Sequence, residues 1–172
     1  MELFEKVKKS ETIYDGKIFT VKKEVVELPD GSEAERETVV HVGGVGVIAI
    51  NDEGKIPMVR QYRNGIEEVT LEIPAGKLER GEDPKLCGRR ELKEETGYSA
   101  KKFELLFRMA PTPAYCGEIL YVFRAEGLEF EGQKLDTDEY LEIEYYTPEE
   151  LKAMVYDGTI IDAKTMAAVM MI

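Results

Sequence analysis

The sequence has few of the residues on which several common enzyme mechanisms depend. It contains one histidine, His41, so it offers no HExxH zinc motif and no choice of histidine for a catalytic triad. None of its serines lies in a GxSxG motif. The two cysteines, Cys87 and Cys116, are too few for a disulfide framework and form no CxxC motif, so we expect reduced thiols. The available chemistry is therefore that of carboxylates, arginines, tyrosines, backbone groups and metal ions.

Long apolar segments and excess positive charge are also absent. The longest apolar run, residues 45–50, has the length of a strand and is too short to cross a bilayer. The first ten residues, MELFEKVKKS, lack the apolar segment of a signal peptide, so we expect a cytoplasmic protein with no membrane partner. The net charge of -12 argues against nucleic acid as a partner, because excess Lys and Arg hold phosphate backbones. An acidic site can still bind a small phosphorylated substrate through divalent cations.

Residues 1–41 predict a small N-terminal antiparallel β subdomain. A hairpin is expected over residues 11–27, with its turn at Asp15-Gly16. Residues 29–31 form a second turn, and residues 37–42 a third strand. Such a sheet is only marginally stable by itself, so it packs either on the rest of its own chain or on a partner subunit.

Residues 42–172 predict the main domain. The run VGGVGVIAI, residues 42–50, is typical of a strand that is buried on both faces. Further strands are expected at residues 56–62, 69–73, 103–109, 119–125 and 139–146, and a loop at the acidic residues 126–137. Helices are expected from an Asp83 cap to Gly97, from a capping box at Thr147 to about Tyr156, and after Asp162. This order predicts an α+β fold, a three-layer α/β/α sandwich with a mixed sheet.

The stretch Leu71–Tyr98, LEIPAGKLERGEDPKLCGRRELKEETGY, concentrates carboxylates in a fixed geometry. Glu91 and Glu95 lie about 40° apart on the expected helix, with Glu94 on the edge of the same side. Like charges at this spacing destabilise a helix by about a few tenths of a kcal/mol unless a cation neutralises them. Arg90 can pair with Glu94 but does not neutralise the group, whereas Mg²⁺ takes oxygen ligands and would. On the helix alone, a solvated acidic face is the commoner explanation.

The features linked to this helix resemble the complete Nudix box. A glycine at position 76 is followed by five residues and Glu82, and then by seven residues and Arg-Glu-Leu at positions 90–92. One residue later come Glu94 and Glu95, then one more residue, Gly97 and a hydrophobic residue, Tyr98. The Nudix fold that this resemblance implies, a mixed sheet between helices, agrees with the sandwich expected from the pattern.

The resemblance to the Nudix family also implies roles for residues of the box. Glu91 and Glu95 bind the metal ions, with Glu94 beside them and the Ala75 carbonyl as a further ligand. Gly76 lets the backbone turn back onto the helix. The remaining two positions, Glu82 and Arg90, are implied to orient the acids and to be structural, respectively.

Sequence before the box resembles the ADP-ribose pyrophosphatase branch of the family. The segment VRQYR, residues 59–63, precedes LEIPAG, residues 71–76. Arginines at a strand end can hold phosphate or ribose oxygens, because the guanidinium group binds anions in a bidentate way. Arg63 is the first candidate for substrate binding and Arg60 the second, and a surface arginine is the alternative for each. Glu72 is expected to point towards the site.

Sequence after the box extends the same resemblance. Pro113 lies sixteen residues after Gly97, as in this branch, and the following AYCGE ends in an acid, Glu118, that is implied to bind substrate. Ala114 departs from the glycine that is common there.

The acidic stretch LDTDEYLEIE, residues 135–144, is implied to supply a further acid. In this branch a Glu of that loop binds metal or activates water, and Glu139 is the match, with Asp138 and Asp136 as reserves. Thr137 departs from a position that is often acidic, so Glu139 could be the general base or a metal ligand only. A solvated acidic loop is the alternative.

The same branch implies a homodimer formed through the N-terminal subdomain, where Tyr14 or Phe19 could stack on adenine. Ordinary packing within the hairpin explains these aromatic side chains equally well.

The function implied is hydrolysis of ADP-ribose to AMP and ribose 5-phosphate, assisted by Mg²⁺ or Mn²⁺. Metal ions would polarise the diphosphate and lower the pKa of a bound water. A carboxylate, Glu139 or one of the box such as Glu94, would take the proton. Hydrolysis of another nucleoside diphosphate sugar or of a dinucleotide is the neighbouring alternative. A non-catalytic ADP-ribose sensor is the alternative from another class, against which the complete set of metal-binding acids argues.

Overall fold

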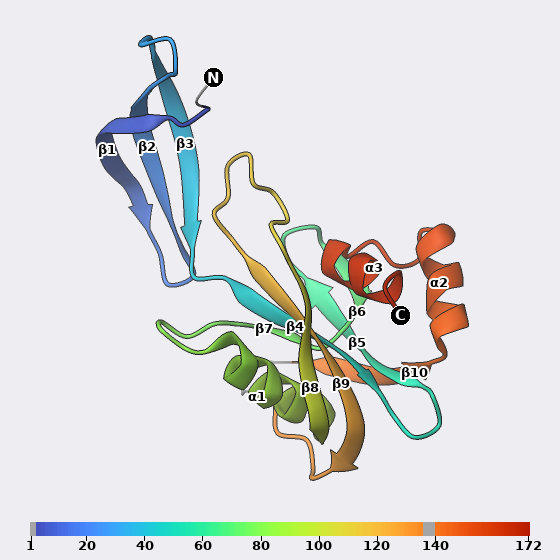
Figure 1. Cartoon of the computed structure of the whole chain (residues 1–172). Helices are drawn as coiled ribbons and strands as arrows, with labels where there is room; N and C mark the ends of the chain where they lie inside the picture. Colours follow the sequence, from blue (N-terminus) through green and yellow to red (C-terminus); the bar gives the residue numbers. More distant parts are fainter. Residues whose placement is uncertain (1–2, 136–139) are drawn as a thin grey trace. The chain divides into compact units, whose positions relative to one another are not determined.

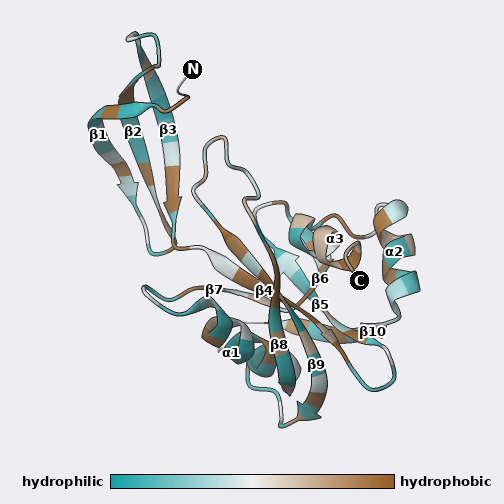
Figure 2. Cartoon of the chain, in the orientation of Figure 1, coloured by the Kyte–Doolittle hydropathy of each residue, from teal (hydrophilic) through white to brown (hydrophobic). Residues whose placement is uncertain are grey.

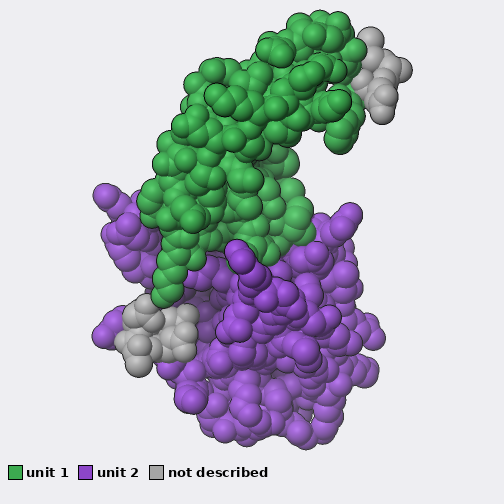
Figure 3. Space-filling model, turned by 90° about the vertical axis from the view of Figure 1, so that its left-hand side faces the viewer, with its two compact units in different colours: residues 1–43, 110–119 green, residues 44–109, 120–172 purple. Residues whose placement is uncertain are grey.

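Three antiparallel strands form the N-terminal sheet of the computed structural model, which describes residues 3–135 and 140–172 (Figure 1). They are β1 (Lys6–Asp15), β2 (Phe19–Glu27) and β3 (Glu33–His41), in the order β1-β2-β3. The predicted hairpin is confirmed, although β1 and β3 both begin earlier than the sequence suggested. The sheet belongs to the first of two compact units, Met1–Gly43 with Ala110–Ile119, which Figure 3 colours separately from the second.

The segment Ala110–Ile119 is joined to β3 by backbone hydrogen bonds. The Val39 N–H donates to the Tyr115 carbonyl over 2.7 Å, and the Gly117 N–H donates to the Val39 carbonyl over 2.9 Å. The loop that carries Pro113 is therefore part of this N-terminal unit, although it follows the box in sequence.

The second unit is Gly44–Met109 with Leu120–Ile172, and its described residues form two sheets. A mixed sheet has the order β7-β4-β9-β8, in which β4 and β9 are parallel. Its strands are β4 (Gly44–Ile50), β7 (Ala75–Lys77), β8 (Tyr98–Met109) and β9 (Leu120–Phe130). An antiparallel sheet has the order β10-β5-β6, formed by β5 (Ile56–Arg63), β6 (Glu68–Glu72) and β10 (Leu141–Tyr146).

Strand β4 is buried on both faces, as predicted, and Figure 2 shows it as largely hydrophobic. Val45, Val47 and Ala49 join the core cluster that includes Cys87 and Leu92 of the helix after β7. Ile48, which points to the other face, joins the cluster of the C-terminal helices. Because side chains alternate along a strand, this one strand separates the two cores.

Within the described residues, three helices cover these cores. They are α1 (Pro84–Thr96), α2 (Pro148–Tyr156) and α3 (Ala163–Val169), and Figure 1 shows α1 on one side of β4 and β9 with α2 and α3 on the other. The predicted α+β fold with a mixed sheet between helices is confirmed. No helix in the described part of the chain is both long and apolar enough to span a membrane.

The helix boundaries follow the capping signals in the sequence. The Asp83 side chain accepts hydrogen bonds from the first-turn N–H groups of α1, and Gly97 ends the helix with a left-handed φ of 77°. Thr147 and Glu150 form the predicted capping box of α2, and Asp162 caps α3.

Two strand predictions were wrong. Residues 126–130 were expected to be a loop, but they continue β9 because Phe130 pairs with Tyr98 at the start of β8. Strand β8 accordingly begins directly after Gly97 and not at Phe103. Pairing between distant strands therefore overrides the acidic character of the sequence at residues 126–130.

Gly88 in the middle of α1 allows the helix to approach the sheet closely. A Cβ added there would lie 3.0 Å from the Phe103 ring and 3.2 Å from the Phe123 ring. We expect Gly88→Ala to destabilise the protein by about 1 kcal/mol, because crowding of two stacked rings outweighs the gain in helix propensity. Urea unfolding measures this, and a stabilised variant would contradict it.

Candidate functional site

The acids of the box are held together by Arg90, which lies at the centre of a small ion-pair network. Its guanidinium contacts Glu94 at 2.8 Å, Glu91 at 2.8 Å and Glu82 at 3.2 Å. Burial tends to raise the pKa of Glu82, but hydrogen bonds from Arg90 and from the Glu79 N–H lower it overall. The pairing of Arg90 with Glu94 was predicted from their spacing, and the structure adds the other two partners.

Two further contacts place Glu91 and Glu95 against the short strand β7. A Cβ on Gly76 would lie 1.9 Å from the Glu91 carboxyl carbon, so the glycine makes room for that carboxylate. The Ala75 N–H donates to Glu95 Oε2 over 2.9 Å. Both glutamates are buried, at 7% and 2% exposure. The structure thus brings together three of the predicted metal-binding residues, Ala75, Glu91 and Glu95.

Gly76 does not act as predicted. It lies within β7, paired with Val45, and its φ is outside the left-handed region. The interpretation of a tight turn at this position was therefore wrong. Glycine is needed because a side chain would occupy the space of the Glu91 carboxylate.

The chemistry of these residues suits a hard divalent cation. All the donors, the carboxylates of Glu91, Glu94 and Glu95 and the Ala75 carbonyl, are oxygen atoms, which Mg²⁺ prefers. Among residues 3–135 and 140–172, however, no three His, Cys, Asp or Glu side chains are arranged to hold a metal as they stand. Arg90 supplies the positive charge at Glu91 and Glu94 in this arrangement. The predicted acid Glu139, with Asp136 and Asp138, lies outside the described residues.

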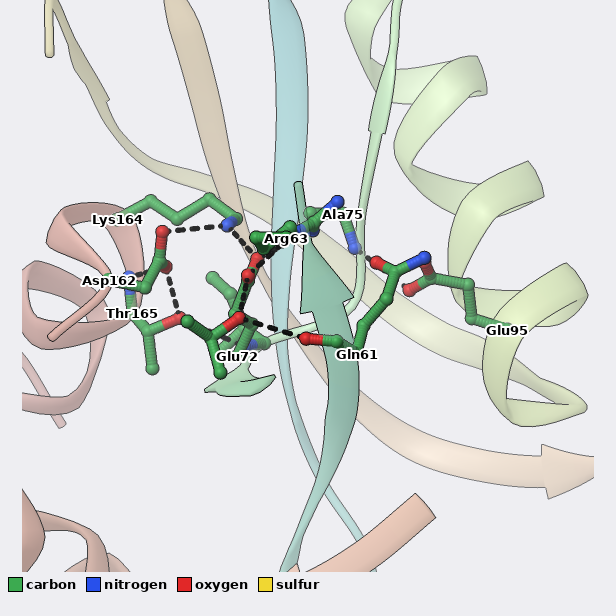
Figure 4. Close-up of polar contacts among 10 residues, drawn as sticks. Gln61, Arg63, Glu72, Ala75, Glu95, Asp162, Lys164 and Thr165 are labelled. Atoms are coloured by element: carbon green, nitrogen blue, oxygen red, sulfur yellow. Dashed lines mark hydrogen bonds and ion pairs between the residues drawn. The ribbon is translucent and has the colours of Figure 1, made fainter. Parts of the chain in front are cut away.

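A second cluster surrounds Glu72 at the end of β6 (Figure 4). Arg63 of β5 binds its carboxylate through Nε and Nη2, both at 2.7 Å, and Thr70 Oγ1 donates to it over 2.6 Å. Lys164 of α3 contacts Oε2 of the same carboxylate. Arg63, Glu72 and Lys164 line a pocket of about 520 Å³, together with Asn64, Gly65, Ile66, Thr70, Ile161, Asp162 and Ala163. This pocket contains two predicted substrate-binding residues, Arg63 and Glu72.

The sequence did not single out Lys164 or Thr165 as parts of a site. Thr165 Oγ1 accepts a hydrogen bond from the Ile73 N–H over 2.9 Å, so α3 contacts both Glu72 at the end of β6 and Ile73, which follows it. The available signal was weak: Lys164 is the one charged residue in the short helix AKTMAAV. It is 8% exposed, which is rare for lysine without a partner.

Two other predicted residues are placed differently. Arg60 of β5 is bound by Glu144 of β10, with Nε and Nη2 at 3.0 and 3.1 Å from the two carboxylate oxygens, and it does not line the pocket. Glu118 belongs to the N-terminal unit, where its carboxylate lies 3.3 Å from His41 Nδ1. The rings of Tyr14 and Phe19 lie 5.8 Å apart in the same unit and pack on each other.

The ion pairs and hydrogen bonds of Glu72 should make the free energy of unfolding depend on pH in the acid range. Burial tends to raise the pKa of Glu72, but Arg63, Lys164 and Thr70 together lower it from 4.5 to about 2. A lowered pKa stabilises the fold above pH 4.5, and this contribution is lost as the pH falls through 2. We expect Glu72→Gln to lower the free energy of unfolding by about 3 kcal/mol at pH 7. The difference between the two proteins should shrink from pH 4.5 to pH 2 in denaturant titrations, and a difference that is constant with pH would contradict it.

Comparison with known proteins identifies the family of the chain. Residues 40–169 match the NUDIX domain family, and residues 5–39 match the family described as the nucleoside diphosphate sugar hydrolase N-terminal domain. An ADP-ribose pyrophosphatase of Bacillus subtilis is 44% identical over 97% of this chain and 91% of its own. A protein of Bacillus methanolicus named methanol dehydrogenase activator is 42% identical over 96% of this chain and 90% of its own.

A solved structure described as an ADP compounds hydrolase shares the fold. It superposes with a TM-score of 0.85 at 23% identity and covers 97% of this chain and 91% of its own. Since the family pattern spans the strands, the helix α1 and the acids described above, the chain belongs to the NUDIX domain family.

Proposed function

We propose that this protein hydrolyses the diphosphate of ADP-ribose to AMP and ribose 5-phosphate with the help of Mg²⁺, for which Mn²⁺ could substitute. The observation that carries the proposal is the 44% identity, over nearly the whole of both chains, to a protein named ADP-ribose pyrophosphatase. The match of residues 5–39 to the N-terminal domain of nucleoside diphosphate sugar hydrolases supports the same class of substrate.

Glu91, Glu95 and the Ala75 carbonyl would hold the metal, with Glu94 beside them. The bound metal would supply charge stabilisation for the diphosphate and a water of lowered pKa. Arg90 keeps the acids in place by its contacts with Glu82, Glu91 and Glu94. We propose Glu139 or Glu94 as the carboxylate that takes the proton from water.

Arg63 is the residue that we propose to bind substrate in the pocket. Glu72 holds its Nε and Nη2 edge, which directs the Nη1 edge away from the carboxylate. The side chain is 41% exposed, so this edge can donate to a phosphate or ribose oxygen. Arg60 and Glu118 remain secondary candidates, and Arg60 would have to release Glu144 to take part.

We also propose a cytoplasmic homodimer formed through an N-terminal subdomain, residues 1–41, with residues 42–172 as the hydrolase domain. All ten residues of β1 are exposed, including the apolar Val7 and Ile13, which a second copy would cover. Both cysteines are free, which fits a reducing compartment. Light scattering on the full chain and on Ile13→Asp tests the dimer. Monomeric behaviour of the unmodified protein at micromolar concentration would overturn it.

The substrate is tested by following AMP release from ADP-ribose, several sugar nucleotides and a dinucleotide, each with and without Mg²⁺. We expect ADP-ribose to give the highest kcat/KM and chelation to remove activity. A higher kcat/KM for another compound would shift the assignment to that compound. Tight nucleotide binding without hydrolysis in any divalent metal would support the non-catalytic sensor.

A further inference from the structure

Lys164 lies at the start of α3, far in sequence from the acids of the box, yet it contacts the residue that holds Arg63. Its amine contacts Glu72 Oε2 and lies 3.0 Å from Asp162 Oδ1. The side chain is 10% exposed and that of Glu72 is 4% exposed. A charge buried to this degree is placed by its partners and not by solvent.

The Glu72 carboxylate is shared between two cations, as Figure 4 shows. Its Oε1 accepts from Arg63 Nε and from Thr70 Oγ1, and its Oε2 accepts from Arg63 Nη2 and from Lys164 Nζ. Each bond in this set is charge-assisted and therefore shorter and stronger than a neutral one. Removing Lys164 would leave Oε2 with Arg63 Nη2 as its single partner and remove one of the four hydrogen bonds that fix the orientation of the carboxylate.

We propose that Lys164 is a positioning residue for substrate binding, which acts by fixing Glu72 and through it the guanidinium of Arg63. The inference rests on the proposed role of Arg63 in binding the substrate. Bidentate pairing requires both carboxylate oxygens in the plane of the guanidinium, so a rotated Glu72 would misdirect the Nη1 edge of Arg63.

The attachment of α3 does not depend on Lys164 alone, which allows its role to be isolated. Thr165 Oγ1 still accepts from the Ile73 N–H, and Asp162 still caps the helix through the Thr165 N–H and hydroxyl. Lys164→Met keeps an unbranched apolar side chain, one atom shorter, and removes the charge and the donors. We therefore expect the helix to stay docked in this variant.

The test is a double-mutant cycle in ADP-ribose hydrolysis with Lys164→Met, Arg63→Ala and the double variant. We expect Lys164→Met to raise KM about fivefold with kcat within about twofold. In the Arg63→Ala background the same change should alter KM by less than about twofold, because its target is gone. Lys101→Met, which removes an exposed ion pair with Glu129 on the mixed sheet, is the matched control and should leave both constants unchanged.

The outcomes separate this inference from the proposed function. Absence of hydrolysis by the unmodified protein would overturn the proposed function. An unchanged KM in Arg63→Ala would overturn the role of Arg63 and with it the inference. If Arg63→Ala is impaired, unchanged KM in Lys164→Met would overturn the inference. Effects that multiply in the double variant would also overturn it, because Lys164 would then contact substrate independently of Arg63. If the methionine variant unfolds at the assay temperature, Lys164→Gln replaces it in the same double-mutant cycle, with the same expected changes in KM.

Discussion

Replacing Glu95 by glutamine should lower kcat by about a thousandfold or more and leave the fold intact. Glu95 Oε2 accepts the Ala75 N–H over 2.9 Å, and a glutamine carbonyl oxygen can accept the same hydrogen bond. The substitution therefore removes a negative charge without leaving a backbone donor unsatisfied. Loss of one anionic ligand for the metal removes several kcal/mol of charge stabilisation, which corresponds to this change in rate.

The measurement is the rate of AMP release from ADP-ribose at saturating Mg²⁺, with thermal unfolding in parallel. The unfolding midpoint should stay within about 3 °C of that of the unmodified protein. Glu129→Gln, which alters an exposed ion pair with Lys101, is the matched control and should keep full activity. Retained turnover in Glu95→Gln at saturating Mg²⁺ would rule out the role assigned to Glu95.

The helices and the central strand were predictable because their signals are local. Asp83, Pro84 and Gly97 mark the ends of α1 by capping chemistry that involves only the helix itself. The apolar run in β4 indicates burial on both faces without knowledge of its neighbours. Arg90 and Glu94 lie one turn apart on a helix, so their contact also follows from spacing.

Contacts between distant segments were not predictable in the same way. Lys164 meets Glu72 across 92 positions of sequence, and Thr165 meets Ile73 across the same separation. The sequence pattern places Lys164 on a helix but does not say which strand end that helix will approach. Of the residues that line the pocket, the sequence therefore indicated only those on β5 and β6, which are Arg63 and Glu72.

The two arginines of β5 illustrate the same limit. Arg60 and Arg63 are three positions apart, so their side chains leave opposite faces of the strand. Strand β10 lies along β5 and supplies Glu144 as a partner for Arg60, whereas Arg63 pairs with Glu72 of β6 in the pocket. The sequence ranked Arg63 first but could not show that a neighbouring strand already engages Arg60.

Substituting Gly76 by alanine should lower kcat/KM by about a hundredfold with little loss of stability. An added Cβ would lie 1.9 to 2.4 Å from the carboxyl atoms of Glu91, which is closer than any real contact. The obstructed group is the far end of a flexible side chain, so Glu91 can move away without disturbing the backbone. This movement takes the Glu91 carboxylate away from its position against β7, where we propose that it binds the metal. Misplacing a catalytic group by about 1 Å can reduce the rate a hundredfold.

Gly44→Ala on the neighbouring strand β4 is the matched comparison. A Cβ there would lie 2.9 Å from the Gly76 carbonyl oxygen, a backbone atom that cannot move without breaking the pairing of β4 with β7. We therefore expect Gly44→Ala to lower the unfolding midpoint by about 4 °C or more, and Gly76→Ala by less than half of that. Raising the Mg²⁺ concentration should restore part of the activity of Gly76→Ala, because a displaced ligand weakens metal binding without removing the carboxylate. Full activity in Gly76→Ala at low Mg²⁺ would show that catalysis does not require Glu91 at this position against β7. A large loss of stability in Gly76→Ala would show that the glycine is required by the strand and not by the carboxylate.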